Sequence, residues 1–333
     1  MMARIRSIKR PAGAQIIGVG GYRPAREVGN EEVCTRINSS DEWIRRRSGI
    51  VTRRFAAPDD TVISMGAKAA VEALAQAGID PDEIGMVLLA SMSYLEQAPA
   101  AAPRIATMIG ARSAGAMDVG AACAGFCYAL GLADSLVSGG SVGYTLVIGS
   151  ERMTDIVDPE DRDTAFIFGD GAGAVVVGPG DVPGMGPVVW GSDGEGHKLI
   201  AHDRSWLHAR DQLHPWPTLR MSGPEVFRWA TRVVPQIGRQ ALAAAGIEAS
   251  DLSVFIPHQA NIRIIDSAAK ALNLLPATVV AKDIIESGNT SAASIPLALD
   301  RLLSQGALPS GGHALLVGFG GGLTHAAQVV TLP

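Results

Sequence analysis

The chain has 333 residues, of which 47% are hydrophobic and 18% are charged, which excludes a disordered protein and suffices for one large globular unit or two intimate halves. A formal net charge of -5 argues against a general nucleic-acid binder. No window approaches the roughly 18 consecutive apolar residues of a membrane span, and the basic start leads into Pro11 and Gly13 rather than an apolar signal core, so we expect a cytoplasmic protein.

The elements of the first half follow one another as helices and buried strands. A helix is predicted to end at 77–80, and apolar strands are predicted at 86–89, 146–149 and 175–177. Strands that are apolar throughout and alternate with Ala-rich helices are typical of sheets covered on both faces. The sequence therefore predicts an α/β architecture.

The segment 118–126 is the first that suggests chemistry. It reads as a short strand, a run of small residues that permits a sharp turn, and a helix that opens at Cys123. A thiol at a helix N-terminus feels the partial positive charge of unpaired backbone N–H groups, which lowers its pKa. We therefore expect Cys123 to be reactive.

The other two cysteines receive a plainer interpretation. Cys34 and Cys127 are expected to be small buried hydrophobes, as most lone cysteines are. Three cysteines are too few and too scattered for a disulfide framework, and no C-x-x-C pair suggests zinc or redox chemistry. A cysteine with a special role here is therefore a nucleophile.

Two Gly-rich segments invite a nucleotide-binding interpretation, which their spacing disfavours. The segment 18–21 has Arg rather than Gly at position 23, and 169–173 lacks the dinucleotide spacing, so tight turns explain the glycines. Four histidines fit neither a helical i,i+4 pair nor a zinc pattern, so we expect no metal: His197, His202, His208 and His214.

A Gly/Pro-rich stretch at 178–187 is the predicted boundary between two halves. We expect an N-terminal half at residues 1–180, which carries the nucleophile, and a C-terminal half at 181–333. Residues 190–220, with three tryptophans and two prolines, are predicted to form an irregular loop that covers the substrate.

Two segments of the first half recur in the second. The segment 77–80 is repeated at 245–248, a shift of 168 (245 minus 77), and 146–149 is repeated at 315–318, a shift of 169 (318 minus 149). Two matches at nearly one shift indicate a duplicated half. The shift of 169 carries Gly120 onto Asn289.

The repeat therefore places a second corner opposite the first. The segment 288–294 takes the position that the Cys123 corner has in the first half, so both are expected near the centre of the molecule. His258 follows a buried strand that Pro257 ends, and the carboxyl end of a strand is where α/β sheets place ligand-binding groups.

Six motifs together carry a resemblance to a known family, and they span nearly the whole chain. They are SDEWI at 40–44, ACAGF at 122–126, FGDGAGA at 168–174, PHQAN at 257–261, GNTSAAS at 288–294 and GFGGG at 318–322. The sequence resembles β-ketoacyl-acyl carrier protein synthase III, the initiating condensing enzyme of fatty-acid synthesis. The resemblance implies the thiolase fold, with two duplicated halves layered α/β/α/β/α.

The resemblance also implies a mechanism. Cys123, His258 and Asn289 would form the catalytic triad, and the backbone N–H groups of Cys123 and Gly321 would form the oxyanion hole. Cys123 would take an acyl group from acyl-coenzyme A. Malonyl-acyl carrier protein would then lose carbon dioxide, and the resulting enolate would accept hydrogen bonds from neutral His258 and from Asn289. No cofactor is implied, since coenzyme A thioesters enter as substrates.

The resemblance further implies binding residues and a homodimer. Coenzyme A contacts are implied for Trp43, Arg47, Arg162 and Asn261. Carrier-protein docking is implied for Arg228, Arg263 and Lys270.

Ala98 and Phe319 are implied for the acyl pocket. Ala98 takes a position where some members carry a bulky aromatic across the dimer interface, so we expect tolerance of branched or longer starters.

Several rival functions stay open at this point. A thiolase would need a second active-site cysteine, and a hydroxymethylglutaryl-coenzyme A synthase would need a catalytic Glu near the nucleophile, for which Glu151 is poorly positioned. A priming ketosynthase III or an acyltransferase of a polyketide pathway is hardly separable by sequence. A catalytically dead scaffold is disfavoured because Cys123, His258 and Asn289 are all present.

Overall fold

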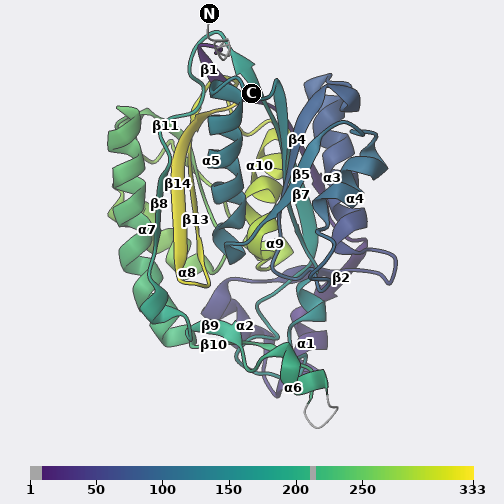
Figure 1. Cartoon of the computed structure of the whole chain (residues 1–333). Coiled ribbons are helices and arrows are strands. Elements are labelled where there is room, and N and C mark those ends of the chain that lie inside the picture. The colour runs from purple at the N-terminus through teal and green to yellow at the C-terminus, as the bar shows by residue number, and fades with distance from the viewer. Residues whose placement is uncertain (1–9, 211–214) are drawn as a thin grey trace, which may run out of the picture.

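Two five-stranded sheets form the frame of the molecule (Figure 1). The computed structural model describes residues 10–210 and 215–333, so the predictions on the basic start and on His214 lie outside the described residues. The first sheet is built from residues between 13 and 180, and the second from residues between 189 and 331.

The strands of the first sheet lie in the order β1-β7-β6-β4-β5. Strand β4 runs parallel to β5 and β6, while β7 is antiparallel to both β6 and β1. Their bounds are Gly13–Tyr22 for β1, Ile84–Ala90 for β4, Gly115–Val119 for β5, Tyr144–Glu151 for β6 and Gly171–Gly180 for β7. The predicted valine run at 175–177 is fully buried in β7, as expected for a strand covered on both faces.

The second sheet repeats this arrangement in the order β8-β14-β13-β11-β12. Strand β11 is parallel to β12 and β13, and β14 is antiparallel to β13 and β8. Their bounds are Val189–Ser192 for β8, Leu252–Pro257 for β11, Val279–Val280 for β12, His313–Gly320 for β13 and Thr324–Thr331 for β14. The identical strand order confirms the predicted duplication.

Two helices, α5 (Gly125–Ser138) and α10 (Ser294–Ser304), lie between the sheets. Helices α3 (Val62–Ala77) and α4 (Ala102–Ile109) cover the outer face of the first sheet, and α7 (Gly223–Ala245) and α8 (Ile262–Ala271) cover that of the second (Figure 1). The predicted α/β/α/β/α layering is therefore confirmed.

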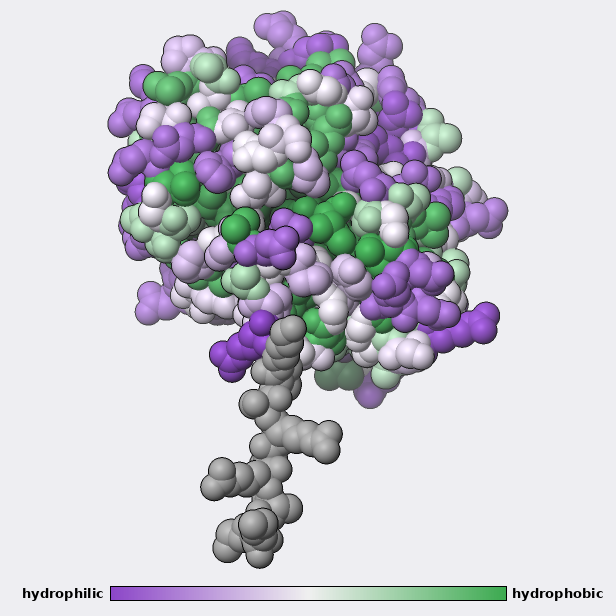
Figure 2. Space-filling model, turned by 90° about the horizontal axis from the view of Figure 1, so that it is seen from above, coloured by the Kyte–Doolittle hydropathy of each residue, from purple (hydrophilic) through white to green (hydrophobic). Residues whose placement is uncertain are grey.

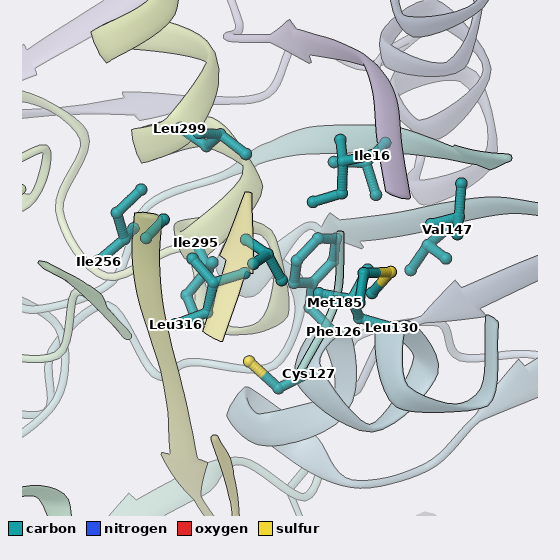
Figure 3. Close-up of a cluster of buried hydrophobic side chains, with 14 of the residues drawn as sticks. Ile16, Phe126, Cys127, Leu130, Val147, Met185, Ile256, Ile295, Leu299 and Leu316 are labelled. Carbon is teal, nitrogen blue, oxygen red and sulfur yellow. The ribbon is translucent and has the colours of Figure 1, made fainter. Parts of the chain in front are cut away.

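The central core joins both sheets through these two helices. Phe126 and Leu130 of α5 pack with Leu299 of α10, Val147 of β6 and Leu316 of β13 (Figure 3). Burying such side chains contributes roughly 1.5–3 kcal/mol each. The two halves are thus held together by one continuous apolar layer beneath the site.

The repeated helix ends have the same local cause. Helix α3 starts at Thr61, whose side chain accepts from the Ser64 N–H, and ends at Gly78 with φ of 65°. Helix α7 ends at Gly246 with φ of 67°. A left-handed residue at this position favours glycine, so the Ala-Gly pair in both repeats marks the end of a helix.

The repeat extends to the two inner corners. A 3-10 turn at Ala122–Ala124 leads into α5, and a matching turn at Ser291–Ala293 leads into α10. Ala122 has φ of 44° and Ser291 has φ of 49°, values that residues other than glycine rarely adopt. Such backbone strain concentrates at functional sites, which directs attention to these corners.

Shorter elements close the end of the molecule drawn lowest in Figure 1. Their bounds are Arg26–Gly29 for β2, Asn30–Ile37 for α1, Asp41–Ser48 for α2, Thr52–Phe55 for β3, Ile200–His202 for β9, Trp206–Arg210 for α6 and Leu219–Met221 for β10. The short helix α9 (Ile284–Ser287) lies nearer the middle of the molecule. Further 3-10 turns lie at Pro81–Glu83, Met153–Asp155, Gly194–Gly196 and Ala249–Asp251.

The prediction of an irregular loop at 190–220 is wrong in part. The described residues of this stretch contain the end of β8, the two-stranded pair β9-β10 and helix α6. Trp190 lies in β8 and Trp206 in α6, whereas Trp216 lies with two prolines in the connection before β10.

Figure 2 shows the opposite end of the molecule, seen from above. Polar residues predominate on this face, and apolar residues are exposed between them near its centre. In the part of the chain that the structure describes, no helix is both long and apolar enough to cross a bilayer.

Candidate active site

One cavity of about 560 Å³ brings together residues from both halves. Cys123 comes from the first half, and His258, Asn289 and Phe319 come from the second. His258 directly follows β11 and Phe319 lies near the end of β13, while Cys123 and Asn289 lie in the connections that lead to α5 and α10. The duplicated topology carries these residues to a common centre.

Cys123 is the middle residue of the turn before α5 and is only 5% exposed. Its sulfur lies 3.3 Å from the Ser291 hydroxyl, which belongs to the opposite corner. A Cβ at Gly320 would stand 2.7 Å from the Cys123 Cβ, so only glycine allows strand β13 to pass this close.

Burial raises the pKa of the Cys123 thiol to about 12, against the hydrogen bond from Ser291 and the backbone N–H groups of Cys123 and Gly321, which lower it. The expected depression of the thiol pKa is therefore wrong, because a sulfur enclosed by protein loses more water solvation than these donors return. The Cys123 thiol is therefore protonated at neutral pH.

The same contacts bear on the predicted oxyanion hole. The backbone N–H groups of Cys123 and Gly321 both reach the Cys123 sulfur. Two N–H donors beside a nucleophile are placed for the oxygen of a bound thioester. The assignment of these two groups to an oxyanion hole stays a prediction.

His258 directly follows β11, as the sequence predicted, and its backbone N–H donates to the Val317 carbonyl at 2.8 Å. Its ring lies 5.1 Å from the Phe319 ring, edge to face. Burial lowers the pKa of the imidazole to about 3, so the ring is neutral at physiological pH.

Asn289 precedes the corner turn of the second half. Its Oδ1 accepts the Ser291 N–H at 2.8 Å, which fixes the orientation of the amide. The amide NH₂ group has no partner among the described residues, and the side chain lines the cavity. Asn289 is therefore oriented as a donor into the cavity.

We expect acid to destabilise the protein through His258. The pKa of the buried ring is about 3 and its ordinary value is 6.5, so below about pH 6.5 the unfolded chain binds a proton that the native state refuses. The free energy of unfolding should fall by up to about 1.4 kcal/mol per pH unit from about pH 6.5 towards pH 3.

Urea unfolding of the wild type and His258→Asn across this range measures the effect. In His258→Asn, the part of the pH dependence of the unfolding free energy that is due to His258 should be absent. Equal slopes in both proteins would contradict a neutral buried imidazole.

Three of the four residues assigned to coenzyme A line the cavity, and the fourth, Arg162, lies beside them. Trp43 and Arg47 of α2 line it, and the guanidinium carbons of Arg47 and Arg162 lie 5.5 and 5.2 Å from the Trp43 ring centre. Asn261 also lines the wall, where its Oδ1 accepts the Arg263 N–H and its Nδ2 donates to the Arg47 carbonyl, both at 2.9 Å.

The residues assigned to carrier docking are not all at the mouth. Arg228 and Arg263 line the cavity, and Arg263 lies 4.8 Å from the Phe227 ring centre. Arg228 forms an ion pair with Glu225 at 2.8 Å. Lys270 is exposed farther along α8 and does not line the cavity.

The two residues assigned to the acyl pocket lie apart. Phe319 lines the cavity, whereas Ala98 is exposed on the loop between β4 and α4 and does not line it. A role for Ala98 in an acyl pocket therefore needs a second copy of the chain.

From the sequence, Glu151 is a candidate only for the catalytic Glu of a rival function. It is fully buried, and its carboxylate accepts the N–H groups of Ser93 at 3.1 Å and Ala292 at 3.3 Å. Burial raises its pKa. The shift of 169 pairs Glu151 with Gly320, a signal that could have indicated its place beside the Asn289 corner.

The remaining candidates give no second site. Cys127 is buried in the core, Cys34 is half-buried, and all three cysteines are free. Within residues 10–210 and 215–333, no group of three His, Cys, Asp or Glu side chains is arranged to hold a metal. His202 packs against Trp206 with ring centres 5.0 Å apart.

Comparison with known proteins places this site in a family. The model for 3-oxoacyl-[acyl-carrier-protein] synthase III matches residues 117–194, and the model for its C-terminal part matches 242–332. The β-ketoacyl-[acyl-carrier-protein] synthase III 1 of Streptomyces coelicolor is 51% identical, with 100% of both chains covered.

Solved structures agree. The priming β-ketosynthase of the R1128 polyketide biosynthetic pathway is 48% identical with a TM-score of 0.97, covering 99% of this chain and 98% of that one. The 3-oxoacyl-[acyl-carrier-protein] synthase III of Aquifex aeolicus is 37% identical with a TM-score of 0.88, covering 96% and 100%.

Proposed function

Since this chain belongs to the β-ketoacyl-acyl carrier protein synthase III family, we propose that it joins an acyl-coenzyme A starter to malonyl-acyl carrier protein through an acyl thioester on Cys123. The observation that carries the proposal is the convergence of Cys123, His258 and Asn289 on one cavity. The predicted division at 180/181 fits this arrangement, since the nucleophile and the two donors then come from different halves.

The first half-reaction loads the enzyme. The Cys123 sulfur attacks the thioester carbon, the new carbon–sulfur bond forms, and the bond to coenzyme A breaks. The thiol proton ends on the departing coenzyme A. The backbone N–H groups of Cys123 and Gly321 are placed to hold the oxyanion meanwhile.

The second half-reaction forms the carbon–carbon bond. Malonyl-carrier loses carbon dioxide, and the electron pair of the broken bond becomes an enolate. His258 and Asn289 donate hydrogen bonds to the enolate oxygen, and the enolate carbon attacks the acyl group on Cys123. The Cys123 thiolate leaves and takes up a proton from water, which restores the thiol for the next starter. The scheme is ping-pong and needs no resident cofactor.

Binding of both thioesters follows from the mouth of the cavity. We assign the adenine and phosphates of coenzyme A to Trp43, Arg47 and Arg162, with Asn261 along the tunnel wall. An acidic carrier protein would dock on Arg228 and Arg263, with Lys270 extending the basic surface along α8.

A homodimer is part of the same proposal. The edge strand β5 and the loop that carries Ala98 form one surface, because the Asp118 carboxylate on β5 accepts the N–H groups of Ala101 and Ala102 at 2.9 Å. Met117 on this edge is 40% exposed. Pairing of two such edges would protect them and bring Ala98 towards the partner's cavity.

We expect Ala98 to set the length of the starter. Ala98→Phe should reduce loading of hexanoyl-coenzyme A by about 10-fold or more relative to acetyl-coenzyme A, because a ring would fill the end of the pocket. The measurement is the rate of Cys123 acylation across a series of straight and branched esters.

Gln97→Phe, on the neighbouring exposed position, is the matched control for adding an aromatic to this loop. It should leave the series unchanged. A wild type with rates flat or falling from acetyl to hexanoyl, or a series unaltered by Ala98→Phe, would refute the assignment.

The pathway has two candidates. Similarity to the Streptomyces coelicolor synthase III favours initiation of fatty-acid synthesis, while similarity to the priming β-ketosynthase favours a polyketide pathway. Transfer to a hydroxyl acceptor is a further variant. Three free cysteines fit a reducing compartment, which supports a cytoplasmic enzyme.

The test of function is reconstitution with purified malonyl-carrier proteins of both pathway types and a panel of acyl-coenzyme A esters. A β-ketoacyl-carrier product supports the proposal, and the preferred carrier identifies the pathway. Acyl transfer to a hydroxyl without release of carbon dioxide would contradict the proposed condensation and would indicate an acyltransferase instead.

A further inference from the structure

Ser294 holds a position that the reaction scheme does not yet use. It is the first residue of α10, is 1% exposed, and its Oγ lies 2.7 Å from His258 Nδ1. His258 is equally buried, so water does not compete for this contact. The contact joins the corner that carries Asn289 to the strand end that carries His258.

The direction of this hydrogen bond follows from the other partner of Ser294. The Gln259 backbone N–H, which can only donate, lies 3.2 Å from Ser294 Oγ, so the oxygen accepts there. The hydroxyl has one hydrogen to give, and among the described residues its other neighbour in hydrogen-bond reach is His258 Nδ1. The hydrogen therefore goes to Nδ1, which acts as the acceptor.

An imidazole that accepts at Nδ1 carries its proton on Nε2 when it is neutral. His258 Nε2 has no partner among the described residues, and the ring lines the cavity with Cys123 and Asn289. From this geometry we infer that Ser294 is a positioning residue which fixes the Nε2–H tautomer of His258 and thereby makes the ring a hydrogen-bond donor towards the substrate.

The inference rests on the proposed function for its catalytic meaning. An Nε2–H ring donates to an enolate oxygen, but it cannot take the Cys123 proton. Asn289 is oriented in the same sense, since its Oδ1 is held by the Ser291 N–H. Both donors are thus oriented from behind by groups of one corner, and His258 serves the condensation rather than the loading of Cys123.

The direct test is the tautomer of His258 by ¹⁵N NMR of the full-length protein with labelled histidine. His258→Asn identifies the resonances by their loss. The wild type should show a bare Nδ1 and a protonated Nε2. Ser294→Ala should give a mixture of tautomers, and Ser294→Thr, which keeps the hydroxyl, should restore the wild-type pattern.

Thr290→Val is the matched control. It removes a buried hydroxyl from the same corner, one with no hydrogen-bond partner within residues 10–210 and 215–333, and nearly preserves the shape of the side chain. It should leave the His258 resonances unchanged. A protonated Nδ1 in the wild type, or an unchanged pattern in Ser294→Ala, would overturn the inference.

Activity provides the second readout. Ser294→Ala should lower the condensation rate by about 10-fold to 100-fold, the range found when a group that orients a metal-ligating histidine is removed. Acylation of Cys123 by acyl-coenzyme A should change by no more than about 3-fold, because it does not need the His258 donor. Equal losses in both steps would reveal a merely structural role.

The two proposals fail separately. If the wild type neither loads Cys123 nor condenses, the proposed function is wrong, and the NMR result still decides whether Ser294 sets the tautomer. If the wild type condenses but Ser294→Ala shows the wild-type tautomer, only the assignment of Ser294 falls.

Discussion

Cys123→Ala is expected to abolish acyl loading and to lower the condensation rate by about 10⁴-fold or more, because losing the nucleophile of a concerted catalytic unit disables the whole unit. The substitution removes one buried sulfur and leaves the oxyanion N–H groups in place. Intact-protein mass spectrometry and the rate of β-ketoacyl-carrier formation measure both effects.

Cys127→Ala is the matched control, since Cys127 lies four residues later, in the first turn of α5, and is also buried. The Cys127→Ala substitution should lower the free energy of unfolding by on the order of 1 kcal/mol, and the variant should still form the acyl adduct on Cys123. An adduct that persists in Cys123→Ala and disappears in Cys127→Ala would reverse the assignment of the nucleophile.

Asn289→Asp is expected to lower the condensation rate by about 10²-fold to 10³-fold, the cost of losing one preorganised donor. The change keeps the shape and the Oδ1 that accepts the Ser291 N–H. It replaces only the NH₂ edge, and an ionised carboxylate cannot donate to an enolate. His258→Ala should have an effect of similar size.

Asn273→Asp, at an exposed position, is the control for the added charge. It should be neutral. Loading of Cys123 should survive in Asn289→Asp and His258→Ala, and the double variant should lose less than the product of the single effects. If both variants lost loading and condensation equally, the assignment of these two residues to the enolate would be wrong.

The position of the two inner corners could be predicted because the internal repeat is detectable in the sequence. The shift of 169 carries Ala122 onto Ser291, and these two residues share the same unusual backbone conformation. A duplicated fold places equivalent corners face to face, so Cys123 and Asn289 could be paired before any coordinates were known. His258 could be located since a proline ends its strand.

Burial and distant contacts account for what the sequence did not supply. The pKa of Cys123 depends on how completely other segments enclose the sulfur, so the helix N-terminus alone gave the wrong direction. Ser294 and Glu151 contact residues that are far away in the chain. Ala98 lies outside the cavity of its own chain, and the boundary at 180/181 stays a prediction.

The central claim is that Cys123 carries the starter between two substrates. The most direct test is mass spectrometry of the Cys123 peptide after incubation with acyl-coenzyme A esters, followed by malonyl-acyl carrier protein. The proposed mechanism predicts an acyl adduct that disappears as β-ketoacyl-carrier and carbon dioxide form in equal amounts. No adduct with any ester, or an adduct that malonyl-carrier does not discharge, would contradict it.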